Sequence, residues 1–164
     1  MIRIRPARIK DLDVVTQIYN DVVLNTVATL DTEPKTIKEQ EYWFTDHDSR
    51  SPILVAEEDG LVLGWASLSR WSGRCGYCDT SEISVYVGGK YRRKGIGRSL
   101  VERILETAEE VGLHTVIARI TAGSESSIRL FESVGFIHIG TLREVGRKFD
   151  TLLDVHLMQK VFDN

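Results

Sequence analysis

The amino-acid sequence predicts an α/β fold of the α+β kind, with a mixed, mostly antiparallel sheet of about six to seven strands and helices on both faces. Its 164 residues, 42% of them hydrophobic, are enough for a single core, so we expect residues 1–164 to form one domain. A strand–helix–strand pattern over residues 83–120 predicts one parallel strand pair joined by a crossover. The Asp59-Gly60 step between two apolar runs predicts a hairpin, and hairpins make neighbouring strands antiparallel.

Seven segments have the alternation or the short apolar runs of β-strands. They cover residues 2–5, 53–56, 61–68, 83–87, 115–120, about 136–141 and 153–161. With the predicted helices between them, the order along the chain is β-α-α-β-β-β-α-β-α-β-β. This order predicts the mixed sheet, because only the crossover near the middle of the chain joins parallel strands.

Four segments have the periodicity or the end signals of helices. Asp11 is placed to cap the first helix, whose apolar stripe comprises Val14, Val15, Ile18, Tyr19, Val22 and Val23. Thr36 and Glu39 have the spacing of a capping box at the start of the second helix. The third helix is expected over about residues 95–111 and the fourth over about residues 124–134, and a glycine follows each of them as a stop signal.

Charge and hydropathy limit the partners and the location of the protein. The formal net charge is −3, from 24 acidic and 21 basic residues spread through the chain. No large cationic face follows from this distribution, so nucleic acid is not expected as a partner. No apolar run approaches the roughly 20 residues that cross a bilayer, and the first residues lack the apolar region of a signal peptide. We therefore expect a cytoplasmic protein without a membrane partner.

Cys75 and Cys78 have the C-x-x-C spacing of a dithiol oxidoreductase, which is one reading of this segment. A redox dithiol needs a helix start beside the first thiol to lower its pKa. Residues 79–87 alternate like a strand instead, which argues against that reading. A zinc site would need a second pair of ligands, so no metal is expected. The histidines are scattered singly at His47, His114, His138 and His156.

The most informative stretch is residues 82–100, in which a strand passes through a basic, glycine-bearing turn into a helix. Unpaired backbone N–H groups at a helix start favour an anion, and Gly95 and Gly97 lack side chains that would hold a phosphate away. A pyrophosphate is therefore a suitable ligand. The same residues would also fit an ordinary turn with a solvated basic face. Neither the dinucleotide fingerprint, whose third glycine is replaced by Leu100, nor a Walker A motif is present.

Residues 92–97, Arg-Arg-Lys-Gly-Ile-Gly, match the R/Q-x-x-G-x-G/A signature of the GNAT superfamily of N-acetyltransferases in its usual strand–turn–helix setting. The resemblance extends over nearly the whole chain. Within the superfamily the sequence most resembles the phosphinothricin and methionine sulfoximine acetyltransferase group. The supporting segments are Ile18-Tyr-Asn20, residues 28–34, the pattern of Arg74, Tyr77, Thr80 and Glu82, Val85-Tyr-Val87, and Gly146 and Lys148 followed by Asp154.

This resemblance implies the GNAT fold and acetyl-CoA as cosubstrate. The strand at residues 85–87 would pair through its backbone with the pantetheine arm, and the amides of residues 93–98 would surround the pyrophosphate. The start of the fourth helix would meet the arm from the other side. The cofactor-binding residues implied are Val85, Tyr86, Val87, Arg92, Arg93, Lys94, Gly95, Ile96, Gly97, Arg98 and Ser124.

Two departures from the family pattern affect the expected chemistry. Ser124 stands where the family often has Asn, and its side chain can still form one hydrogen bond to the cofactor but has a shorter reach. Phe131 stands where many GNAT enzymes have the Tyr that protonates the leaving sulfur, and Phe cannot act as an acid. A thiol with a pKa near about 8.5 leaves tolerably well without an acid, so activity is still expected.

An amine substrate is mostly protonated near neutral pH and must lose a proton before it attacks a thioester, so a general base is needed. The resemblance places this base at Glu82, which acts directly or through a water, and places the thioester oxygen on the Val85 backbone N–H. A Glu that only solvates the strand end is the alternative reading.

The resemblance also implies the substrate pocket and a homodimer, in which the second subunit often completes that pocket. The substrate-binding residues implied are Thr29, Leu30, Arg74, Gly76, Tyr77 and Lys148. Arg74 and Lys148 would suit the carboxylate of an amino-acid-like amine, and either could instead be a surface cation. Leu30 and Leu152 stand where relatives tend to have Phe and Trp, so phosphinothricin itself is not assumed. Acetylation of a protein or peptide amine and a non-catalytic acyl-CoA-binding module are the alternative functions.

Overall fold

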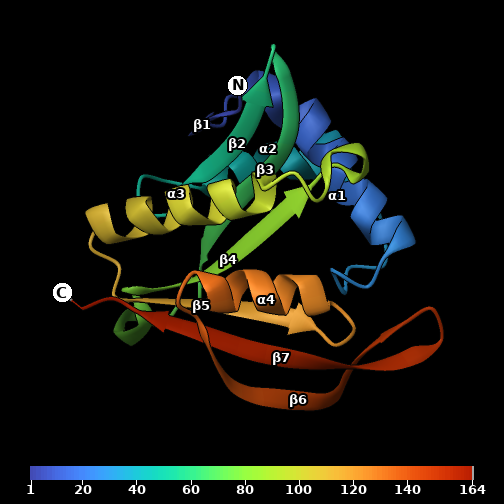
Figure 1. Cartoon of the computed structure of the whole chain (residues 1–164), viewed down its shortest axis with the longest axis vertical. Helices are drawn as coiled ribbons and strands as arrows, with labels where there is room; N and C mark the ends of the chain where they lie inside the picture. The colour runs from blue at the N-terminus through green and yellow to red at the C-terminus, as the bar shows by residue number, and fades with distance from the viewer. Residues whose placement is uncertain (164) are drawn as a thin grey trace.

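The computed structural model describes residues 1–163 and contains one sheet flanked by helices (Figure 1). The strands are β1 (Arg3–Pro6), β2 (Ile53–Glu58), β3 (Leu61–Arg70), β4 (Thr80–Val87), β5 (Thr115–Thr121), β6 (Ile137–Lys148) and β7 (Thr151–Val161). The α-helices are α1 (Leu12–Asn25), α2 (Ile37–Asp46), α3 (Ile96–Glu110) and α4 (Glu125–Ser133). Three short 3-10 turns are η1 (Ile9–Asp11), η2 (Cys75–Tyr77) and η3 (Gly89–Tyr91).

The seven strands form a single mixed sheet in the order β1-β2-β3-β4-β5-β7-β6. β4 and β5 are parallel and are joined through α3, whereas every other neighbouring pair is antiparallel. The predicted fold class and the predicted parallel pair are therefore confirmed. β6 lies at one edge of the sheet and β1 at the other.

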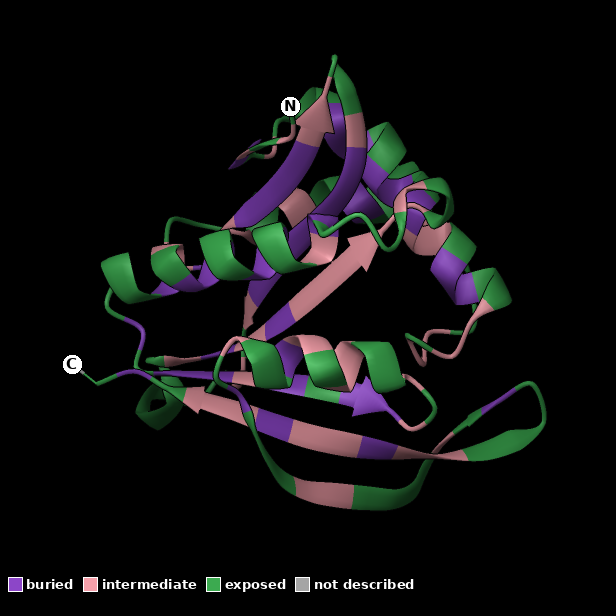
Figure 2. Ribbon diagram, viewed as in Figure 1, coloured by how far each residue is buried: buried purple, intermediate pink, exposed green. Residues whose placement is uncertain are grey.

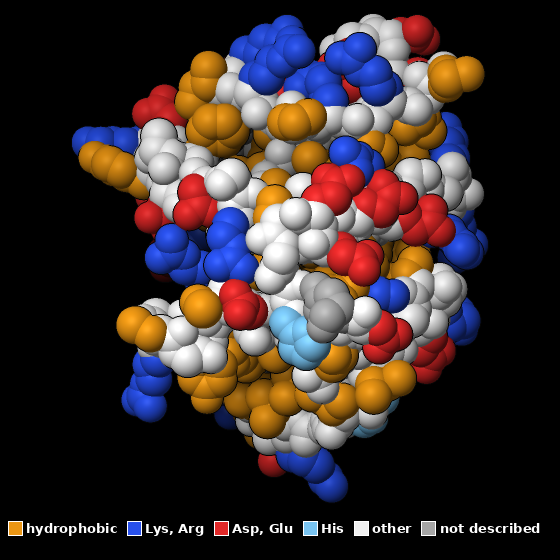
Figure 3. Space-filling model, turned by 90° about the vertical axis from the view of Figure 1, so that its left-hand side faces the viewer, with side chains coloured by type: hydrophobic (Ala, Val, Ile, Leu, Met, Phe, Trp, Pro, Cys, Tyr) orange, Lys and Arg blue, Asp and Glu red, His pale blue; other side chains and the backbone are white. Residues whose placement is uncertain are grey.

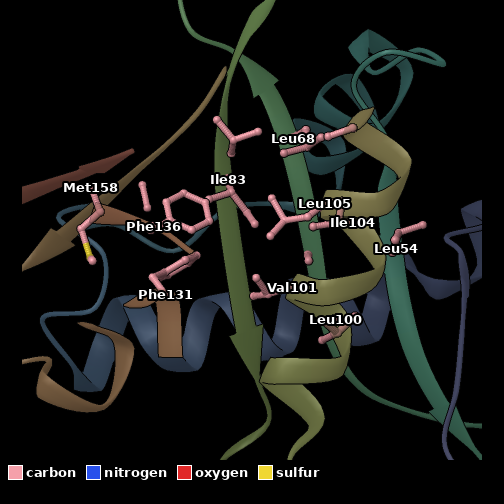
Figure 4. Close-up of a cluster of buried hydrophobic side chains, with 14 of the residues drawn as sticks. Leu54, Leu68, Ile83, Leu100, Val101, Ile104, Leu105, Phe131, Phe136 and Met158 are labelled. Atoms are coloured by element: carbon pink, nitrogen blue, oxygen red, sulfur yellow. The ribbon is translucent and has the colours of Figure 1, made fainter. Parts of the chain in front are cut away.

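Helices cover both faces of the sheet, as the sequence predicts (Figure 1). The larger core lies between the sheet and one side of α3 and α4, and it contains the buried side chains Leu68, Ile83, Leu100, Ile104 and Phe131 (Figure 4). A smaller cluster on the α1 side contains Val15, Ile18, Val55 and Trp65. Figure 2 shows the resulting pattern most clearly for α3, which buries the side toward the sheet and exposes the other.

The ends of two elements differ from the prediction. Asp11 precedes α1, but its side chain does not cap that helix. Its carboxylate instead accepts hydrogen bonds from the Arg8 backbone N–H at 2.7 Å and from the buried Arg5 guanidinium at 2.8 Å. Val14, which was placed in the apolar stripe of α1, is exposed at 36%. The Asp11 carboxylate is used to neutralise Arg5 inside the fold, which the local sequence pattern could not indicate.

The hairpin of β6 and β7 is longer than predicted, because the strands continue to a tight turn at residues 149 and 150. Phe149 and Asp150 both have left-handed backbone angles, with φ of 50° and 56°. Such a pair of angles matches the two-residue turn that suits the twist of a hairpin. The turn was missed because the Asn-Gly or Asp-Gly signal of such turns is absent here.

Over residues 1–163, no helix combines the length and the apolarity that a membrane span requires. Within the same residues, no group of three or more His, Cys, Asp or Glu side chains is arranged to hold a metal ion.

Candidate functional site

The candidate site lies where β4 and β5 separate. The two strands pair only at Thr80, Ser81 and Glu82, opposite residues 115–117. β4 then continues to Val87 alongside β3, whereas β5 continues alongside β7. Beyond Glu82 the facing edges of β4 and β5 therefore do not pair with each other, and the sheet is open at its centre.

The open edge of β4 presents the backbone of Val85 and Val87. The Gly88 amide donates to β3 over 2.8 Å, and the Thr80 carbonyl accepts from the residue after β3 over 3.2 Å. The Asp79 carbonyl points the other way and accepts from the start of β5 over 2.9 and 3.1 Å. Because backbone groups alternate along a strand, the N–H and C=O groups of Val85 and Val87 face the opening. They can pair with an extended ligand as another strand would.

A cavity of about 550 Å³ occupies this opening and reaches both faces of the sheet. On one face it is bounded by α1, by the loop after α1 and by β6, and on the other by the start of α4. The lining residues are Tyr19, Ala28, Thr29, Leu30, Asp31, Glu82, Ile83, Ser84, Val85, Tyr86, Ala118, Arg119, Ile120, Thr121, Ser124, Ser127, Phe131, Leu142, Val145 and Val155. This volume is in the range of sites for small molecules.

Glu82 lies at the point where the two strands part. Its side chain is 20% exposed, and its carboxylate accepts two hydrogen bonds from the guanidinium of Arg119 on β5. One of them joins Arg119 Nη2 to Glu82 Oε1 over 2.7 Å. The carboxylate raises the pKa of Arg119, which keeps the guanidinium charged. Glu82 and Tyr86 are an even number of residues apart on β4, so both side chains are on the α1 face of the sheet.

The loop after α1, residues 26–36, forms one wall of the cavity and is held by side chains of α1 and β6. The Tyr19 hydroxyl hydrogen-bonds Thr29 Oγ1 over 3.1 Å and donates to the Asp31 carboxylate. Burial and this carboxylate raise the pKa of Tyr19, so its hydroxyl stays protonated as a donor. Lys148 Nζ donates to the Thr29 carbonyl over 2.9 Å. Leu30 packs over Gly146, where a Cβ atom would come within 2.4 Å of it.

Tyr86 forms the floor on this side of the cavity. Its ring contacts that of Tyr19 with the centroids 5.3 Å apart and that of Trp65 with the centroids 5.1 Å apart. Burial raises the pKa of the Tyr86 hydroxyl to about 12. The aromatic contacts therefore fix the orientation of β4 against α1 next to the cavity.

The basic turn before α3 has the geometry of an anion site. Arg93 and Gly95 have left-handed backbone angles, with φ of 63° and 79°, and Gly95 precedes the first helical residue. The first three amides of α3, from Ile96 to Arg98, have no acceptor within the helix. The cationic side chains of this turn are exposed, and the Ile96 side chain is buried in the core. Only the backbone of Ile96 is thus available to a ligand.

Gly97 faces the protein instead of solvent. A Cβ atom there would lie 3.6 Å from Leu130 Cδ2 on α4 and 3.7 Å from Val87 Cγ2 on β4. The start of α3 thus packs against α4 and the open end of β4 at this residue. Both distances are ordinary contacts, so packing alone does not require glycine here, and the expected room for a phosphate stays a prediction.

The start of α4 closes the other side of the cavity. Ser124 precedes the helix, and its hydroxyl makes no capping bond, so it is available to a ligand in the cavity. Phe131, about two turns further along α4, is 4% exposed and packs against Phe136 with the ring centroids 5.0 Å apart. Phe131 also lines the cavity, where it supplies an apolar wall and no proton.

The chain matches the family model described as Acetyltransferase (GNAT) family over residues 15–136. The chain belongs to the GNAT acetyltransferase family. The predicted family is thereby confirmed.

Three similar proteins cover almost the whole GNAT chain. An L-methionine sulfoximine/L-methionine sulfone acetyltransferase from Pseudomonas aeruginosa is 39% identical and covers 98% of this chain and 94% of its own. YncA from Salmonella typhimurium, solved with its cofactor acetyl-CoA, is 35% identical and superposes with a TM-score of 0.97. The match covers 100% of this chain and 95% of the YncA chain. A ribosomal-protein-alanine N-acetyltransferase from Brucella melitensis is 40% identical, covers 98% and 99%, and has a TM-score of 0.95.

The structure brings together only some of the residues predicted for this GNAT site. Those that line the cavity are Thr29, Leu30, Glu82, Val85, Tyr86 and Ser124. Arg74, Gly76 and Tyr77 lie in or beside η2, are exposed and do not line it. Lys148 is 4% exposed and turns its amine to the loop after α1. The substrate roles of these four residues stay predictions.

The lining residues that were not predicted as site residues include Tyr19, Arg119 and Leu142. Tyr19 lies in the segment Ile18-Tyr-Asn20, which is part of the resemblance to the family, so its place in the site could have been inferred from that resemblance. Arg119 lies within a β-rich run and has no local signal, because its partner Glu82 is 37 residues away. Its position became clear only from the pairing of β4 with β5.

Proposed function

We propose that this GNAT protein transfers an acetyl group from acetyl-CoA to the primary amine of a small amino-acid-like substrate. The observation that carries this proposal is the position of Glu82, whose carboxylate lines the same cavity as the free backbone edge of Val85. A base and an oxyanion donor thus face one space. The names of relatives that act on L-methionine sulfoximine and L-methionine sulfone support this substrate class.

Several features of the chain suit acetyl-CoA. The free N–H groups at the start of α3 and the positive end of its dipole would bind the pyrophosphate, beside the exposed cations of residues 92–98. Val85 and Val87 would pair through their backbone with the amides of the pantetheine arm, and Ser124 would face it from α4. Acetyl-CoA supplies the acetyl group as a reactive thioester. The complex of YncA with acetyl-CoA supports this assignment.

In the reaction, Glu82 accepts a proton from the substrate ammonium, directly or through a water, which frees the nitrogen lone pair. The neutral amine forms the new N–C bond at the thioester carbonyl, and the C–S bond breaks with both electrons going to sulfur. The nitrogen loses its second proton to solvent as the amide forms. The Val85 N–H stabilises the negative charge that develops on the carbonyl oxygen. Phe131 cannot protonate the sulfur, and the low basicity of a thiolate makes that proton unnecessary for departure.

The substrate would enter from the α1 face of the sheet. Leu30 from the loop, together with Leu142 and Val145 from β6, supplies apolar surface to this side of the cavity. The resemblance implies five further residues that complete the pocket: Thr29, Arg74, Gly76, Tyr77 and Lys148. The apolar surface on this side of the cavity suits an amine with an uncharged side chain better than an amine with a long polar side chain.

The experiment that tests the proposal measures release of free CoA thiol with acetyl-CoA and a panel of amines. The panel contains L-methionine sulfone, L-methionine sulfoximine, phosphinothricin and short peptides with an N-terminal alanine. We expect turnover with at least one of the free amino-acid analogues and little with the peptides. Turnover of peptides alone would support the second candidate, a peptide N-acetyltransferase, which the similarity to the Brucella melitensis protein favours. Binding of acetyl-CoA without turnover of any amine would support a non-catalytic module.

A homodimer is the proposed assembly. The exposed apolar side chains of the β6–β7 region are Ile137, Ile139, Leu142, Val145, Phe149, Leu152 and Val161. Figure 3 shows hydrophobic side chains gathered on the lower part of the face that it presents, at the level of β6 and β7 in Figure 1. An edge strand with this much apolar surface needs a partner. Light scattering should give the mass of two 18.6 kDa chains, and Ile139→Glu should give that of one.

We also propose that the protein works in the cytoplasm. Cys75 and Cys78 are both free and exposed, and a reducing compartment preserves exposed thiols in that state. Cell fractionation with an antibody to the native chain would test this location.

A further inference from the structure

Arg119 is held in a defined orientation beside Glu82. Its Nε and Nη2 atoms both donate to the Glu82 carboxylate in a two-pronged pair, and its guanidinium lies 5.8 Å from the centre of the Trp71 ring. A planar guanidinium that is fixed on one edge by a carboxylate and approached by an aromatic ring has little freedom to turn. The side chain is thus preorganised on the wall of the cavity.

This arrangement leaves donors of Arg119 available to a ligand. A guanidinium has five N–H groups, and the pair with Glu82 uses the Nε–H and one on Nη2. No acceptor among residues 1–163 is bonded to Nη1. The side chain is also 54% exposed although it lines the cavity. The outer edge of the guanidinium can therefore receive an anion while the inner edge still holds Glu82.

The cavity has few other groups that could bind a carboxylate. Of the described residues that line it, Arg119 alone carries a positive charge, whereas Asp31 and Glu82 are acidic. Lys148 donates instead to the Thr29 carbonyl, and Arg74 is not part of the lining. A carboxylate in the cavity would thus be stabilised next to Arg119 and repelled elsewhere on this face.

We propose that Arg119 binds the α-carboxylate of the substrate amino acid while Glu82 receives its α-ammonium group. The inference rests on the proposed function and adds to it the residue that selects free α-amino acids. In such a molecule the two charged groups are attached to one carbon atom, and Glu82 and Arg119 present the complementary charges in direct contact with each other. Arg119 is a specificity residue in this account, and Glu82 remains the base.

The same pairing selects against peptides. The N-terminal residue of a peptide has an uncharged amide where the free amino acid has its carboxylate, so the guanidinium would lose its anionic partner. Discrimination by a site that is built for one hydrogen-bonding group is strong when the competitor lacks that group. Arg119 thus gives a physical reason for a free amino acid as substrate.

The test compares L-methionine sulfone with its primary carboxamide, which lacks the carboxylate, as substrates of the parent, Arg119→Gln and Arg119→Lys. For each compound, the kcat/KM of the variant is divided by that of the parent. The two compounds differ in amine basicity, but this difference affects parent and variant alike and cancels in the ratio. We expect Arg119→Gln to lose about 10- to 100-fold with the acid and much less with the carboxamide. Arg119→Lys should recover part of the loss with the acid, because Lys keeps the positive charge but cannot donate two parallel hydrogen bonds as a guanidinium does.

The matched control is Arg103→Gln on α3, which removes another exposed, ion-paired arginine at a position outside the cavity and should change neither ratio. An equal loss with both compounds would overturn the proposal, because Arg119 would then act only through Glu82. A parent that prefers neither compound but acetylates both would also overturn it, while leaving the proposed function intact. A parent that binds acetyl-CoA and acetylates neither compound, nor any other amine, would contradict the proposed function itself.

Discussion

The side-chain amine of Lys148, at the end of β6, donates a hydrogen bond over 2.9 Å to the backbone carbonyl of Thr29, in the loop after α1. The two residues are 119 positions apart in the chain. Because Lys148 is 4% exposed and Leu30 packs over Gly146 next to it, the loop and the hairpin form one unit beside the cavity. The lysine that the sequence suggested as a carboxylate ligand thus supports the wall of the pocket.

Replacing Lys148 by Met tests this supporting role. The variant keeps most of the apolar stem but leaves the Thr29 carbonyl without its donor, which typically costs about 1–3 kcal/mol for a buried group. We expect a lower free energy of unfolding in urea and a higher KM for the amine, with acetyl-CoA affinity little changed. Lys38→Met on the exposed side of α2 is the control. A Lys148→Met protein that matches this control in stability and KM would remove Lys148 from the account.

Burial lowers the pKa of Lys148 below its ordinary value of 10.5. Between the folded-state pKa and 10.5, the unfolded chain binds more protons at this site than the folded chain. The free energy of unfolding of the parent should therefore rise, relative to that of Lys148→Met, as the pH increases through this window. Urea titrations of both proteins at several alkaline pH values measure the difference. A difference that is constant or falls with pH would mean that Lys148 is not desolvated in the folded protein.

Cys75 and Cys78 should have no part in the chemistry. Both are exposed, and only the single 3-10 turn η2 separates them from β4, which begins at Thr80, so no α-helix starts at either thiol. The Cys75→Ser, Cys78→Ser double variant should keep most of its acetyl transfer in the thiol-release assay. If it lost more than about a hundredfold in kcat/KM with its fold intact, a catalytic dithiol would have to be reconsidered.

Gly97 tests the binding of acetyl-CoA at the start of α3. A Cβ atom there would make ordinary contacts with Leu130 and Val87, so Gly97→Ala should fit with little change. The two further methyl groups of Gly97→Val would crowd α4 and the open end of β4. We expect Gly97→Val to bind acetyl-CoA much more weakly in calorimetry while it still folds. Equal affinities for Gly97→Val and the parent would show that acetyl-CoA binding does not depend on how the start of α3 packs against α4 and β4.

Local signals were sufficient for much of the fold and part of the site. The capping box of α2 is present as predicted, with the Thr36 amide donating to Glu39 over 2.7 Å, because it depends on residues three apart. The crossover through α3 followed from the change of periodicity between residues 83 and 120. Glu82 and Val85, which line the cavity, were found because they belong to β4, the strand that leads into the signature turn.

Long-range pairings were not predictable in the same way. The contact of Lys148 with Thr29 and that of Arg119 with Glu82 depend on which strands become neighbours and where they part. Nothing in the residues around Arg119 distinguishes a cavity-lining arginine from a solvated one. The register of β4 with β5, which ends at Glu82, decides that difference.

The most direct test of the central claim is the rate of acetyl transfer by Glu82→Gln. Gln keeps the size of the side chain and an oxygen that can accept from Arg119, but it cannot take up the proton of the amine. We predict a fall in kcat/KM of about 10²–10⁴-fold near neutral pH, with acetyl-CoA affinity almost unchanged and partial recovery as the pH approaches the pKa of the amine. Glu109→Gln on the exposed side of α3 should behave as the parent. A Glu82→Gln protein that turns over like the parent at neutral pH, or whose whole defect is weaker acetyl-CoA binding, would contradict the account.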